Sequence, residues 1–157
     1  MNGFFGTIAS YDARLTLGTE KFDGLMLDAK FDTNFYLTPK IVAAAGAEYV
    51  SGEKGSVKPF VTLTSRTIGN SPFYNGVFFP KIGVAYVSGK LFGSLTERIL
   101  VDVSGDNAKL DGFDTAVNVV YNLFSDVQLS GDLGIYICKE KKEMTNSYLT
   151  IKASLAF

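Results

Sequence analysis

Three charged residues at alternate positions of one segment are the first candidates for chemistry. Asp28, Lys30 and Asp32 are each separated by one residue, so in an extended strand their side chains project from the same face. Two carboxylates beside an amine could carry out acid–base chemistry or bind a cation. More often such a set belongs to a network of ion pairs or to a wet surface, and we expect this structural role.

The residue types that most catalytic sites require are scarce. Histidine is absent, which excludes Ser-His-Asp and Cys-His catalysis and the usual zinc sites. The single cysteine, Cys138, cannot form an intramolecular disulfide. Glycines at 69–70 and 105–107 precede no helix, so they indicate turns and not phosphate-binding loops. We therefore expect no enzyme activity, no metal and no cofactor.

Bulk composition narrows the class of protein further. A chain of 157 residues predicts one domain covering 1–157. The net charge of −1 gives no electrostatic reason to expect a nucleic-acid partner. No stretch of about 18 apolar residues exists that could form a transmembrane helix. The first residues lack the features of a signal peptide, so for an exported protein we expect the sequence of a mature form.

The elements that position these residues are strands. From Leu25 to Leu37 the odd positions are almost all apolar, and the even positions carry Asp28, Lys30 and Asp32. The same alternation recurs along the chain, separated by turn-forming clusters, and it predicts antiparallel hairpins without helices. The nine segments that show it are 5–17, 25–37, 41–50, 57–67, 77–87, 91–104, 113–123, 127–137 and 147–157.

The length of these segments suits a membrane. They run for about 10 to 13 residues, whereas strands of soluble sheets average about 5 or 6, and a tilted strand needs about 9 to 11 to cross a bilayer. Alternation leaves two alternatives open. The apolar face meets lipid around a charged lumen in a membrane barrel, or it lines the pocket of a soluble barrel that binds a small hydrophobic ligand.

The end of the chain favours the membrane. Apolar residues alternate through Leu149, Ile151, Ala153 and Leu155 to a terminal Phe157. This pattern resembles the C-terminal signature of bacterial outer-membrane barrels, except that Ala153 stands where an aromatic residue is common. The whole chain is similar to small barrels of the outer-membrane-protein A and opacity type, or to the terminal part of an autotransporter translocator domain.

The resemblance implies a location, partners and a role. It implies an integral protein of the bacterial outer membrane that serves envelope structure, adhesion or translocation. The partners it implies are the lipid bilayer, lipopolysaccharide and the assembly machinery, which would read Leu149, Ile151, Leu155 and Phe157. The charged run 139–143 could touch lipopolysaccharide phosphates, although such runs are more often solvated loops.

A side-chain-filled lumen predicts where the charges pair. We expect the lumen network to comprise Asp28, Lys30, Asp32, Arg98, Asp102, Asp132 and Lys152, with the last four pairing near the C-terminal strands. Glu97 interrupts the apolar face, and a bulge near Gly93 could turn it away from lipid. Aromatic residues near strand ends suit interfacial girdles. They are Phe5, Phe35, Tyr49, Phe78, Tyr86, Phe113 and Tyr121.

The number of alternating segments conflicts with the even number of strands expected for a bacterial barrel. Bacterial barrels of this kind have an even number of strands, and nine segments alternate. Pro59 and Pro80 each interrupt a segment, so one of these two segments is expected to be a loop, which leaves an eight-stranded up-and-down transmembrane barrel. A larger barrel with a missing strand is the alternative. If Phe157 lies at the periplasmic end, counting back places the tight turn at 38–40 on the outside, where long loops are expected.

Overall fold

A computed structural model of the chain describes residues 1–20, 23–52, 67–68, 71–72, 76–104, 106–125, 127–138 and 146–155. Within these ranges no helix is long and apolar enough to cross a membrane. The regular elements of the described part are strands. They are β1 (Asn2–Phe5), β2 (Ala9–Glu20), β3 (Asp23–Thr38), β4 (Ile41–Val50), β5 (Thr67–Ile68), β6 (Ser71–Pro72), β7 (Val77–Ser88), β8 (Leu91–Asp102), β9 (Lys109–Asn122), β10 (Val127–Cys138) and β11 (Asn146–Leu155).

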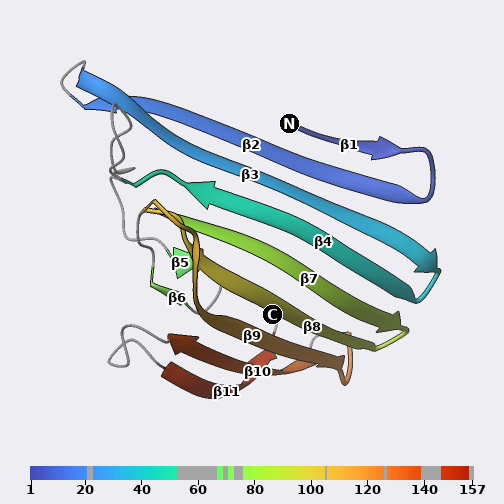
Figure 1. Ribbon diagram of the computed structural model, residues 1–157. Helices are drawn as coiled ribbons and strands as arrows, with labels where there is room; N and C mark the ends of the chain where they lie inside the picture. The colour runs from blue at the N-terminus through green and yellow to red at the C-terminus, as the bar shows by residue number, and fades with distance from the viewer. Residues whose placement is uncertain are drawn as a thin grey trace.

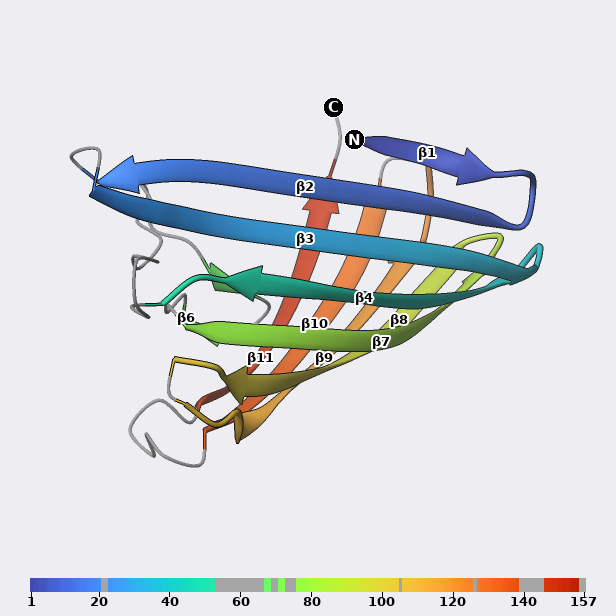
Figure 2. The ribbon, with the colours of Figure 1, turned by 45° about the horizontal axis from the view of Figure 1, so that its top comes forward.

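Nine of these strands form one antiparallel meander. Their order in the sheet is β1-β2-β3-β4-β7-β8-β9-β10-β11. Each strand therefore pairs with the strands of this sheet that come directly before and after it along the chain. The prediction of an all-β, antiparallel up-and-down fold is confirmed. The sheet is not closed, and β1 and β11 are its two edges (Figure 1). It curls strongly, so that β9, β10 and β11 run at a steep angle behind β2, β3 and β4 (Figure 2).

The strands fall into two length classes. Eight of the nine have 10 to 16 residues, and only β1, with four, is short. The predicted segment 57–67 supplies no strand between β4 and β7, because Val50 at the end of β4 lies directly opposite Val77 at the start of β7. Apart from Thr67, which pairs with Pro72 in the small β5–β6 hairpin, that segment lies outside the described residues.

The second proline, Pro80, does lie within a strand. On one side of β7 it is opposite Ala47 of β4. On the other side the β7–β8 ladder runs from Phe78 opposite Val101 directly to Lys81 opposite Arg98, and so skips the proline position. Proline has no amide hydrogen to donate to a ladder, which accounts for the gap.

The connections differ in length between the two ends of the sheet. The short-turn end carries the two-residue turns 39–40 and 89–90 and the four-residue turn 123–126. The long-loop end carries the connections 51–76, 103–108 and 139–145, with the two-residue link 21–22 as the exception. The turn at 38–40 therefore lies at the same end as that at 88–90. The opposite placement counted from the sequence is wrong, because it assumed a strand at 57–67.

The two faces of the sheet have different chemistry. Residues directly opposite one another on neighbouring strands project to the same side. One row across the sheet defines the polar face, and it consists of Asp12, Asp32, Gly46, Lys81, Arg98 and Asp114. The other side, the apolar face, carries among others the exposed residues Leu15, Phe31, Ile82, Leu95, Leu133 and Ile151.

A small apolar cluster also occupies the polar face, at its long-loop end. It consists of Val50, Val77, Phe79, Leu100, Tyr136 and Cys138, all buried. The sequence shows its signal as runs in which apolar residues stop alternating, such as 77–79 and 135–138. The polar face therefore has charges along its middle and an apolar cluster at one end.

Glu97 stays on the apolar face. The ladders run in register through Gly93, which lies opposite Tyr86 on β7 and Val119 on β9. The predicted bulge near Gly93 is therefore wrong, and the register shift in β8 lies later, between Leu100 and Val101. Glu97 lies opposite Thr115, whose Oγ1 donates a hydrogen bond to its Oε2 at 2.5 Å. The threonine hydroxyl thus gives the carboxylate a polar partner on the apolar face.

Candidate functional site

The charges on the polar face form ion pairs across neighbouring strands. Arg14 of β2 reaches both Asp28 of β3, at 3.0 Å, and Glu48 of β4, at 2.8 Å. The two carboxylates are almost fully buried, whereas the arginine side chain remains partly exposed. One guanidinium thereby compensates two carboxylates that would be costly to bury alone.

A second cluster spans three strands. The Asp32 carboxylate lies 3.0 Å from Lys30 Nζ on its own strand and 2.8 Å from Lys81 Nζ on β7. β4 lies between β3 and β7, and its residue in this row is Gly46. A Cβ at Gly46 would overlap the Asp32 carboxylate and lie 2.6 Å from the carbonyl oxygen of Phe31. The absence of a side chain there lets Lys81 reach across the strand.

The third pair is the most deeply buried. Arg98 Nη1 on β8 lies 3.0 Å from Asp114 Oδ2 on β9, and the Asp114 side chain has 0% of its surface exposed. Lys81 on β7 lies directly opposite Arg98 on β8, so two cations lie side by side here. Asp114 compensates one of them and Asp32 the other.

Together these contacts involve four cations and four carboxylates. The set is electrically neutral, and each carboxylate in it already has a cationic partner. No group of three or more potential metal-ligating side chains occurs in the part of the chain that the structure describes. The ion pairs link neighbouring strands across the polar face. It presents no nucleophile with an adjacent base, which hydrolytic chemistry would need.

The remaining predicted network residues have other surroundings. Asp102 accepts hydrogen bonds from the amide and hydroxyl of Ser104, at 2.8 and 2.6 Å, next to the β8–β9 connection. Asp132 accepts a hydrogen bond from the side-chain amide of Asn118. Lys152 is exposed on edge strand β11, opposite Ser130.

Cross-strand register explains which partners the sequence prediction left out. The structure pairs Lys30 with Asp32, both members of the predicted network, and it pairs Asp28, Asp32 and Arg98 with residues that the predicted network did not contain. The residues left out are Arg14 with its second partner Glu48, Lys81 and Asp114. Alternation already places all four on the polar face, but their pairing depends on which residues face each other across strands. That register cannot be read from a single sequence.

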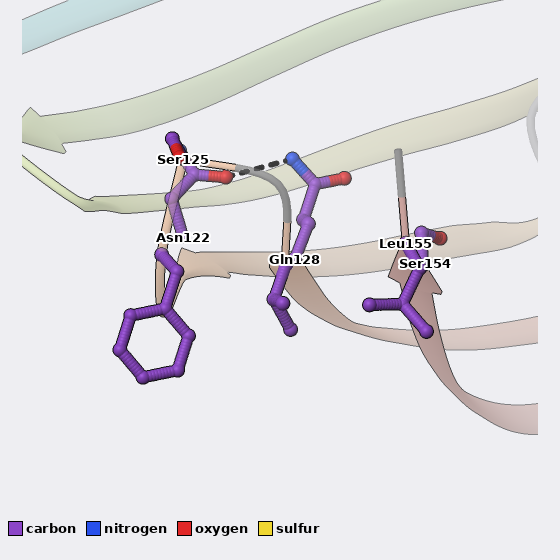
Figure 3. A pocket seen from close by; sticks show the side chains of 7 residues that line it. Asn122, Ser125, Gln128, Ser154 and Leu155 are labelled. Atoms are coloured by element: carbon purple, nitrogen blue, oxygen red, sulfur yellow. Dashed lines mark hydrogen bonds between the residues drawn. The ribbon is translucent and has the colours of Figure 1, made fainter. Parts of the chain in front are cut away.

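A hollow of about 240 Å³ lies at the short-turn end, beside β11 (Figure 3). Gln128 Nε2 donates a hydrogen bond to Asn122 Oδ1 at 2.9 Å within it. Its lining residues in the described part of the chain are uncharged and can offer hydrogen bonds, but none of them is an acid or base for proton transfer. The lining residues are Asn122, Phe124, Ser125, Val127, Gln128, Ser154 and Leu155.

The residues of the predicted C-terminal signal share a face. Leu149, Ile151 and Leu155 project from the apolar face and are exposed, Ile151 by 78%. Phe157 lies outside the described residues. The run 139–143, considered for phosphate contacts, also lies outside them.

Comparisons with known proteins add no identification. No family model, no curated protein and no solved structure matches the chain.

Proposed function

We propose that the chain is an integral outer-membrane barrel of eight transmembrane strands, with the apolar face toward lipid and the polar face as a side-chain-filled lumen. The observation that carries this proposal is the inverted burial of the two faces. The carboxylates of Asp28 and Asp114 are buried, whereas Ile82 and Ile151 are 67% and 78% exposed. Water-soluble proteins bury such aliphatic side chains, and lipid is the medium in which exposing them is favourable.

The strand lengths support eight crossings. The eight long strands have 10 to 16 residues, and about 9 to 11 are needed to cross a bilayer at a tilt. β1, with four residues, is too short to cross. An eight-stranded barrel has an interior just wide enough to be filled by side chains, which agrees with a lumen of ion pairs.

Five aromatic residues of the apolar face fall into two groups along the strands. Tyr49 and Phe78 lie opposite each other toward the long-loop end, at about the level of Phe113. Tyr86 and Tyr121 lie toward the short-turn end, on the same strands as Phe78 and Phe113 but eight residues further along. Eight residues span about 26 Å along a strand, or about 20 Å along the axis of a barrel whose strands tilt by about 40°. Apolar bands of outer-membrane barrels are about 25 Å tall.

The connections support an orientation. Outer-membrane barrels have short periplasmic turns and longer external loops. All four connections at one end, 6–8, 39–40, 89–90 and 123–126, are turns of two to four residues that fit the periplasmic side. The connections 51–76, 103–108 and 139–145 would then lie outside, where they could meet lipopolysaccharide.

The role that fits this arrangement is structural. A neutral network of paired charges leaves little open path for ions and no reactive group for catalysis. Envelope integrity, adhesion through the external loops or translocation are the roles we propose, without enzyme activity or a cofactor. The bilayer, lipopolysaccharide and the assembly machinery, acting through Leu149, Ile151, Leu155 and Phe157, are the proposed partners.

A single introduced tryptophan tests the proposal, because the chain has no natural tryptophan. Ile151→Trp puts the indole on the apolar face and Thr150→Trp puts it on the polar face of the same strand. After refolding into vesicles that contain brominated acyl chains, we expect strong fluorescence quenching at position 151 and little at position 150. The reverse pattern, or a protein that stays in solution without detergent, would favour the soluble ligand-binding barrel.

A further inference from the structure

The two edges of the sheet are incompletely paired. β11 has a strand, β10, on one side only. At the other edge β1 covers just the beginning of β2, from Phe5 opposite Ala9 to Asn2 opposite Asp12, with Met1 adding backbone hydrogen bonds to Ala13. In the described sheet, the rest of β2, from Arg14 to Glu20, has no strand on that side. A closed barrel must join β11 to this edge.

Two charges on the polar face stand apart from its ion pairs. Asp12 on β2 and Lys152 on β11 are exposed, and within the described residues the structure gives neither side chain a hydrogen bond or an ion pair. Asp12 also lies directly opposite another acid, Asp32, and like charges in that position repel. Asp12 therefore lacks a cation, and Lys152 lacks an anion.

The positions of the two residues match. Asp12 is three residues from the start of β2, and Lys152 is three residues from the end of β11. β2 begins and β11 ends at the short-turn end, so along its own strand each charge lies three residues from that end of the described strand. The register of each strand with its neighbour places both on the polar face.

We infer that Asp12 and Lys152 form the ion pair that locks the seam between the first and last long strands when the barrel closes. This inference rests on the proposed function, since it concerns closure of the barrel proposed there. A lysine can make such a contact even with a strand between, as Lys81 does when it crosses β4 to reach Asp32. In that case the intervening residue is Gly46, which has no side chain, whereas Asn2 of β1 lies opposite Asp12, so the Asp12–Lys152 pair forms directly between β2 and β11 once β1 leaves this edge.

Charge reversal tests the pair in vesicles. Asp12→Lys and Lys152→Asp should each lower the urea concentration at the unfolding midpoint, and the double reversal should recover most of the loss. The matched control combines Asp12→Lys with Lys90→Asp, because Lys90 is an exposed cation of the same end whose Nζ contacts the carbonyl oxygen of Leu123. The control combination should recover nothing. Equal recovery by both combinations, or silent single variants, would overturn the pairing.

A crosslink tests the geometry even where reversal impairs folding. Asp12→Cys and Lys152→Cys are combined with Cys138→Ala, which removes the single natural thiol. Mild oxidation of the refolded chain should give an intramolecular crosslink that changes its gel migration. Crosslinked dimers, or no crosslink, would overturn the seam. If the indole of the Ile151→Trp variant is quenched by lipid in that case, the membrane barrel stands and only the seam assignment fails. If that tryptophan is not quenched, the proposed function has failed independently.

Discussion

Removing the Asp114 carboxylate is the most direct way to measure how dry the polar face is. Its side chain is fully buried and lies 3.0 Å from Arg98, which is itself 18% exposed. Asp114→Ala removes the carboxylate that pairs with this guanidinium. The guanidinium then lies next to a second cation, Lys81, which is directly opposite it on β7. Breaking a buried pair from one side typically costs about 3–5 kcal/mol, whereas an exposed pair contributes under about 1 kcal/mol. We expect a loss of about 3–5 kcal/mol.

Urea unfolding of the chain in lipid vesicles measures this loss. Asp106→Ala, an exposed acid in the 103–108 connection, is the control and should change the free energy of unfolding by less than about 0.5 kcal/mol. The double variant Arg98→Met, Asp114→Ala removes both charges and should be more stable than Asp114→Ala alone, since no unpaired charge then remains. A loss below about 1 kcal/mol for Asp114→Ala would mean that water reaches the pair, and the filled-lumen reasoning would be refuted.

Three further changes test other parts of the structure. Gly46→Ala places a methyl group between Lys81 and Asp32 and should lower the free energy of unfolding by about 1–3 kcal/mol in the same assay. The control Gly131→Ala, whose methyl group meets open space, should leave the free energy of unfolding nearly unchanged. Equal effects of the two variants would contradict the Lys81–Asp32 contact across β4. Glu97→Leu removes the acid of the apolar face and should raise stability in vesicles by about 1–2 kcal/mol if that face meets lipid, while a loss would indicate a polar environment. Deleting Phe157 removes at most about 1.5–3 kcal/mol of burial, so it should impair assembly in cells far more than refolding in detergent; unimpaired assembly would exclude a recognition role.

Local patterning was enough to predict the class of fold and most strands. Alternation in segments such as 113–123 and 127–137 gives the positions of β9 and β10 closely, because the period of two fixes which residues share a face. The segment 57–67 also alternates, yet the ladder passes directly from Val50 to Val77. Strand pairing is a long-range choice, and local alternation contains no information about which segment a strand selects as its neighbour.

The candidate site was predictable in kind but not in detail. Its charges could be assigned to one face, because Asp28, Lys30 and Asp32 alternate with apolar residues. The partners could not, since Arg98 pairs with Asp114 only through the register of β8 and β9. The bulge proposed near Gly93 failed for a related reason. A polar residue on an apolar face can keep its position when a neighbour such as Thr115 hydrogen-bonds to it.

The exposure of the apolar face supplies the strongest energetic argument for a surrounding apolar medium. More than ten large hydrophobic side chains of the long strands are exposed there. Fully covering one such side chain with an apolar medium stabilises by about 1.5–3 kcal/mol relative to leaving it in water. The net stability of a typical domain is only about 5–15 kcal/mol, so covering even part of this face would be a large gain. In the proposed membrane barrel, a bilayer would cover the whole face at once without a specific partner, and the paired charges of Asp28, Asp32 and Asp114 would stay away from lipid on the opposite side.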